Sequence, residues 1–191
     1  MNNIIENVKK EMINICKEDI KKSNIDQWNT HIRIVYERGH ELAIERKADV
    51  EIVDLSTILH DIARVMGVGP IEEHNIYGAE IAEGILRKNN YPEEKIERVK
   101  RCIYNHIDNP KESVEEEITA DADVLAHFDN LSMLYYISLG KRKMNLEEAK
   151  KFVKNKLEFD YNKLSQYGKD NYKDRYEKIM KTLFGYNQVT F

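Results

Sequence analysis

The chain has 191 residues, of which 41% are hydrophobic and 34% are charged, and its net charge is −4. Only 3 Pro and 8 Gly interrupt it, which is too few for the many turns of a β-sandwich or barrel, so an all-α fold is expected. No segment reaches the ~18–20 apolar residues of a membrane span. Two cysteines do not make a disulfide framework. A cytoplasmic protein without membrane partners is therefore predicted.

The charges are unevenly distributed along the sequence. Residues 141–191 carry 13 Lys and Arg against 7 Asp and Glu, whereas the rest of the chain is acidic. This basic third could help to hold an anionic ligand, but solvated helix faces explain it as well. Because no dense Lys/Arg run is present, a nucleic-acid partner is not expected.

Apolar residues recur at helical spacing along most of the chain. The first predicted helices cover 3–22 and 29–47, and Asp49 is the expected N-cap of a third helix over 50–65. Loop-forming residues follow in MGVGPIEEHN (66–75), and the loop 66–73 could gate a pocket. The later helices are predicted over 74–89, 92–105, 113–128, 131–139, 145–158 and 169–184. Without repeats or linkers, one domain is predicted over 1–191, with a core of about 28–130 and helices 131–191 packed on it.

One predicted helix carries polar residues where apolar ones are expected. In TILHDIAR (57–64), His60 and Asp61 interrupt a run of apolar side chains. Burying a carboxylate without a partner costs on the order of several kcal/mol, unless it is protonated, paired or bound to a metal. These two residues therefore need an explanation beyond packing.

Other polar residues occur in similar surroundings. His31 lies on the apolar stripe of the second helix, and Asp121 and Asp123 lie among small apolar residues in TADADVLAHF. A divalent cation would satisfy all of these groups, because imidazole and carboxylate are ligands of borderline metals. Adjacent helical residues differ in direction by about 100°, so His60 and Asp61 can bind one ion from neighbouring angles.

The order of these residues and the sequence around them resemble the HD-domain superfamily of metal-dependent phosphohydrolases. The similar segments are THIRIVYERGHELA, STILHDIAR, HNIYGAEIAEGIL, IYNHID and DADVLA, in the family's order over about residues 28–130. The resemblance implies a single-domain helical bundle of the HD type. It also implies that His31, His60, Asp61 and Asp123 bind the metal, with Asp121 as the alternative to Asp123.

The resemblance further implies hydrolysis of a phosphoester of a nucleotide or another small phosphorylated molecule by a metal-activated water. Asp61 would be both ligand and orienter of that water, and Arg64 would contact the phosphate. His74 and His106 would bind a second metal, or else contact the phosphate or protonate the leaving group. The cofactor would be one or two ions of Mn, Fe, Co, Ni, Zn or Mg, and a mono- or a diesterase is equally compatible.

Two other functions remain open for the same residues. A di-iron oxygenase on this scaffold would use the same histidines and aspartates. A non-catalytic, metal-stabilised sensor or partner-binding module would need only the metal. A homo-oligomer is possible in each case. His40 and His127 are not expected to be ligands, because His40 should point away from the face that carries His31.

Overall fold

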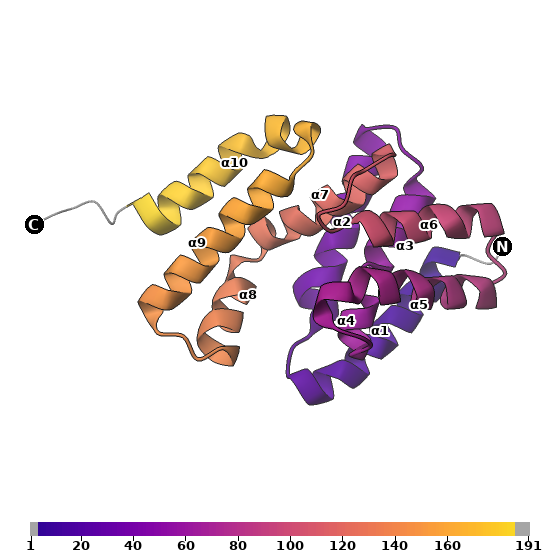
Figure 1. The fold of residues 1–191 in the computed structure, drawn as a ribbon, viewed down its shortest axis with the longest axis horizontal. Helices are drawn as coiled ribbons and strands as arrows, with labels where there is room; N and C mark the ends of the chain where they lie inside the picture. Colours follow the sequence, from indigo (N-terminus) through magenta and orange to yellow (C-terminus); the bar gives the residue numbers. More distant parts are fainter. Residues whose placement is uncertain (1–3, 186–191) are drawn as a thin grey trace, which may run out of the picture. The chain divides into compact units, whose positions relative to one another are not determined.

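Figure 1 shows the computed structural model of the protein, in which residues 4–185 are described. These residues form helices joined by short loops, with no β-strand among them, so the all-α prediction is confirmed. Within the same range, no helix is long and apolar enough to cross a membrane. The chain divides into two compact units, Met1–Asp123 and Val124–Phe191. The predicted packing of helices 131–191 on the core stays a prediction.

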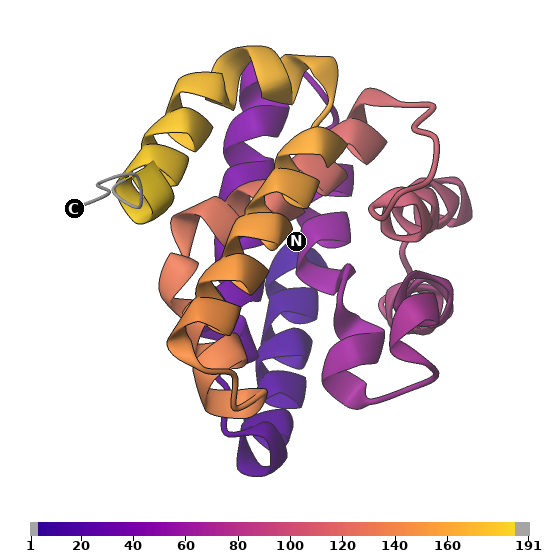
Figure 2. The ribbon, with the colours of Figure 1, turned by 60° about the vertical axis from the view of Figure 1, so that its left-hand side comes forward.

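The first unit is built around one central helix. Its helices are α1 (Ile4–Ser23), α2 (Arg33–Glu45), α3 (Val50–Leu59), α4 (Ile62–Met66), α5 (His74–Lys88), α6 (Glu93–Asn105) and the first part of α7 (Val114–Asp129). The central helix α3 packs against α1, α2 and α6. Next to it, α5 and α6 lie side by side, and Figure 2 views these two helices nearly end-on.

The position of α3 follows from its sequence. Every residue from Ile52 to Leu59 is buried, and a helix that is covered on all sides belongs at the centre of a fold. Asp49 has extended backbone angles, and its side chain accepts a hydrogen bond from the N–H of Ile52 at 3.4 Å. The predicted N-cap is therefore confirmed.

Two predicted helices are interrupted where polar residues occur. The helix expected over 50–65 ends at Leu59, and α4 begins at Ile62, so that the His60–Asp61 pair forms the turn between them. The helix expected over 29–47 begins instead with a π-helical turn, Trp28–Ile32, which contains His31. Both interruptions change the direction of side chains, and π-turns within helices occur frequently at functional sites.

The second unit begins within α7. It continues with α8 (Leu131–Tyr135), a π-helical turn (Tyr136–Lys141), α9 (Leu146–Lys163) and α10 (Gln166–Phe184). The last two helices are longer than predicted, because only Leu164 and Ser165 separate them and the Ser165 hydroxyl caps α10 by accepting from Gly168. These two helices pack against each other and are drawn in orange and yellow in Figure 2.

Candidate metal centre

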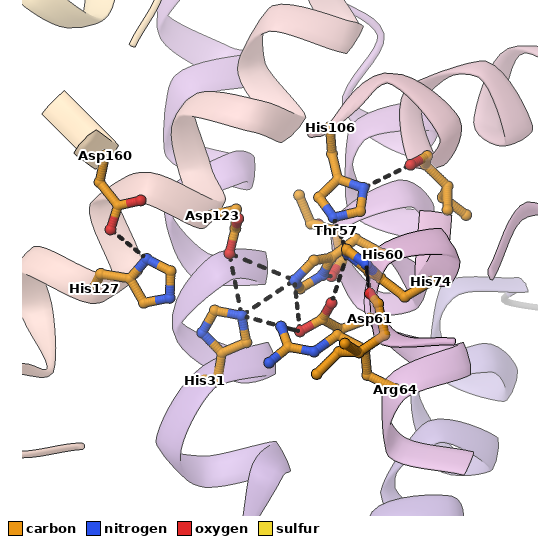
Figure 3. Close-up of polar contacts among 12 residues, drawn as sticks. His31, Thr57, His60, Asp61, Arg64, His74, His106, Asp123, His127 and Asp160 are labelled. Atoms are coloured by element: carbon orange, nitrogen blue, oxygen red, sulfur yellow. Dashed lines mark hydrogen bonds and ion pairs between the residues drawn. The ribbon is translucent and has the colours of Figure 1, made fainter. Parts of the chain in front are cut away.

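Four histidines and two aspartates of the first unit converge on one place, which Figure 3 shows. They come from the π-helical turn before α2, the turn between α3 and α4, the start of α5, the residue after α6 and the middle of α7. In chain order they are His31, His60, Asp61, His74, His106 and Asp123. All six residues predicted as ligands are thus brought together, and we call this set the metal centre. Their binding of a metal stays a prediction at this point.

One half of the metal centre contains the four residues of the H…HD…D pattern. His31 Nε2 lies 3.2 Å from His60 Nε2 and 3.2 Å from Asp123 Oδ1. The Oδ2 atom of Asp61 lies 3.6 Å from His31 Nε2 and 3.8 Å from His60 Nε2. Four potential ligand atoms therefore surround one point from several helices.

The other half is formed by His74 and His106. Their Nε2 atoms are 3.1 Å apart, and His74 Nε2 lies 3.5 Å from Asp61 Oδ1. Asp61 therefore faces the first half through Oδ2 and the second half through Oδ1. A carboxylate in this position can serve both halves at once.

Backbone carbonyls fix the orientation of three rings. In His60, His74 and His106, Nδ1 lies 2.6–2.8 Å from the carbonyl oxygen three residues earlier. A carbonyl only accepts, so each Nδ1–H donates, and the neutral ring keeps its lone pair on Nε2. The two lone pairs of His74 and His106 face each other without a proton between them, and a cation is the group that such a pair can bind.

Burial keeps two of these rings neutral. His106 is 2% exposed, and burial lowers the pKa of His106 to about 3. Burial also lowers the pKa of His74. Both imidazoles are therefore uncharged at neutral pH, which is the form that binds metals.

Asp61 is held in its charged form. Its burial opposes ionisation, but the charged Arg64 guanidinium outweighs this, so the pKa of Asp61 lies well below its usual range. Arg64 Nη1 donates to Asp61 Oδ2 at 2.7 Å. Among the described residues, none donates a hydrogen bond to the buried Oδ1 atom, which is costly for an anionic oxygen. This orphaned oxygen and the nitrogen-rich donor set around it fit a divalent cation.

Asp121, His40 and His127 complete the set of residues named from the sequence. None of the candidate ligand groups among residues 4–185 includes Asp121, so Asp123 is the aspartate that faces His31. His40 lies outside the metal centre and points Nδ1 at the buried Asp54, at 3.0 Å. In the second unit, His127 Nδ1 lies 3.1 Å from the buried Asp160. The sequence analysis missed the three carbonyl acceptors, although the position of each histidine at or near a helix end was a signal for them.

Comparison with known proteins agrees with this geometry. The sequence model of the HD domain matches residues 29–134, more than half of the chain. The crystal structure of a predicted HD superfamily hydrolase from an uncultured Thermotogales bacterium, at 1.45 Å resolution, is similar with a TM-score of 0.55 and 26% identity. That match covers 78% of this chain and 85% of the other. No curated protein matches the sequence. The chain belongs to the HD-domain family, a superfamily of metal-dependent hydrolases.

Proposed function

We propose that the protein is a phosphohydrolase that cleaves a phosphoester of a nucleotide or another small phosphorylated molecule. The observation that carries this proposal is the position of Asp61, with one carboxylate oxygen toward each pair of histidines. A bound divalent metal would make hydroxide available near neutral pH and polarise a phosphoryl oxygen. The six residues of the metal centre have the donor atoms for that role.

The two halves of the metal centre favour two ions over one. His31, His60 and Asp123 would hold one ion together with Asp61, and His74 and His106 would hold the second. The alternative, in which His106 protonates the leaving group, needs a proton on that ring. Burial lowers the pKa of His106 to about 3 and so disfavours the protonated ring that a general acid needs.

Arg64 has two tasks in this proposal. One nitrogen of its guanidinium donates to Asp61 and keeps that carboxylate ionised and oriented. The Arg64 side chain is 43% exposed, so its other N–H groups are accessible to a ligand. A guanidinium presents several donors in one plane, which suits the oxygens of a phosphate.

Metal analysis of the purified protein, combined with a screen of phosphorylated substrates across several divalent ions, tests the proposal. We expect a bound transition metal and hydrolysis of at least one phosphoester, and both should be lost in Asp61→Asn. Bound iron with an absorbing cofactor, oxygen consumption and no hydrolysis would support the oxygenase instead. A bound metal with neither activity, and partner binding that survives His60→Ala, would support the non-catalytic module.

A further inference from the structure

A cavity of about 320 Å³ adjoins the metal centre. Its lining includes Arg64 and His74, and it extends under the loop between α4 and α5. We call it the side cavity. Because His74 in its lining belongs to the metal centre and Arg64 donates to Asp61, a substrate whose phosphate lies at Arg64 would place its remaining part in or near this space.

The lining of the side cavity carries no negative charge, although residues 1–140 are acidic overall. It contains no carboxylate, and Arg64 is its permanently charged residue. Gln27 contributes a half-buried amide, which makes no side-chain hydrogen bond within residues 4–185. Val68, Ile71 and their neighbours supply apolar walls. The cavity therefore offers apolar surface and one uncharged polar group.

The loop over the side cavity exposes apolar side chains. Of the eleven exposed large hydrophobic residues in the described part of the chain, Val68 and Ile71 lie on this loop, and Ile71 is 63% exposed; Met66 and Ile76 lie on the helices at either side. The loop conformation is constrained, because Gly69 has φ +72° and a Cβ there would lie 2.3 Å from the ring of Tyr77. A concentration of exposed apolar groups on a constrained loop beside a catalytic centre is typical of a binding surface.

We propose that the side cavity binds the alcohol half of the substrate and selects a compact, uncharged, largely apolar group over a polyol. This inference rests on the proposed phosphohydrolase function. A polyol entering the cavity would exchange hydrogen bonds with water for contact with Val68 and Ile71, which cannot replace them. An aryl or alkyl group gains from the same contacts. Val68 and Ile71 are thus specificity-determining residues.

Binding of two phosphonates to the metal-loaded protein tests the inference without turnover. The first, 2-phenylethylphosphonate, has an apolar group, and the second, 3,4-dihydroxybutylphosphonate, has a diol of similar reach. By calorimetry we expect the first to bind at least about tenfold more tightly. Ile71→Ser should remove about tenfold of that preference. Ile44→Ser is the matched control, because Ile44 is 60% exposed on α2 and does not line the cavity.

Equal affinities for the two phosphonates, or equal effects of Ile71→Ser and Ile44→Ser, would overturn the inference. Turnover separates this failure from failure of the proposed function. Benzyl phosphate and glycerol 3-phosphate are both monoesters of primary alcohols, so their chemistry is matched. Hydrolysis of both with equal kcat/KM would support the phosphohydrolase function and contradict the selectivity of the side cavity. A preference for the apolar phosphonate without hydrolysis of any phosphoester would support the selectivity of the side cavity and contradict the phosphohydrolase function.

Discussion

Histidines of the metal centre differ from His40, outside it, in the groups that their ring nitrogens face. In the metal centre, three rings donate Nδ1–H to backbone carbonyls and turn Nε2 toward other ligand atoms. Outside it, His40 turns Nδ1 toward the buried carboxylate of Asp54, at 3.0 Å. Either acceptor can orient a ring, and metal-binding histidines use carbonyls and carboxylates alike. What marks the metal centre is therefore that the Nε2 atoms of its rings face one another and Asp61.

The largest expected effect comes from exchanging one buried aspartate in each environment. Asp61→Asn removes the carboxylate shared by both halves of the metal centre, so metal affinity should fall by more than about 100-fold and phosphoester hydrolysis should be lost. Asp54→Asn, at a carboxylate that is equally buried, should keep the metal. Equilibrium dialysis with metal analysis measures both. Equal metal loss in the two variants would break the distinction between the environments.

A second exchange tests whether the two halves of the metal centre hold separate ions. His74→Gln removes one of two facing Nε2 atoms but leaves the ligands of the other half in place. We expect the metal content to drop from two ions per chain to one. His40→Gln is the control and should leave the content unchanged. A wild-type protein with one ion, which His74→Gln retains, would contradict the two-ion arrangement and favour a phosphate contact by His74.

The scarcity of Pro and Gly allowed the all-α class to be predicted. His31, His60, Asp61 and Asp123 stood out as polar residues within apolar helices, whereas His74 and His106 were predicted only from the resemblance to the HD-domain superfamily. The turn at His60–Asp61 was not predictable, since the apolar spacing of Ile58, Leu59 and Ile62 continues through it. The choice of Asp123 over Asp121 rested on the resemblance, because helical spacing alone does not make it. Residues two apart on a helix differ in direction by about 200°, and the rotation of α7 that selects one of them is set by packing.

Arg64 extends the comparison to ion pairs, which occur both beside the metal centre and away from it. Its pair with Asp61 lies beside the metal centre, whereas Arg33 pairs with Glu37 at 2.8 Å on the exposed face of α2. Arg64→Gln should raise KM for the phosphoester by about tenfold to a hundredfold, through loss of a charged donor to phosphate. Arg33→Gln should leave KM unchanged. Steady-state kinetics with the best substrate measures both variants. If KM of Arg64→Gln equals that of Arg33→Gln, Arg64 does not bind the phosphate.

The smallest expected effect concerns the pair formed by Asp54 and His40 and its contribution to the stability of the fold. Burial raises the pKa of Asp54, and the hydrogen bond from His40 offsets this only in part. A carboxyl whose pKa is higher in the folded than in the unfolded state loses stability as pH rises through the folded pKa. Asn at this position keeps an acceptor for His40 but has no charge to bury. Asp54→Asn should therefore raise the free energy of unfolding at pH 8 by up to about 1 kcal/mol, and by less near pH 4.

Urea unfolding in the presence of a chelator measures this difference without a contribution from bound metal. A loss of stability at pH 8 would mean that the charged pair of Asp54 and His40 outweighs the cost of burying the carboxylate. The pair of Asp54 and His40 would then be a stabilising ion pair. A gain at pH 8 that shrinks toward pH 4 would mean that the buried carboxylate is a cost which the fold tolerates. That result would set Asp54 apart from Asp61, whose charge its neighbours stabilise.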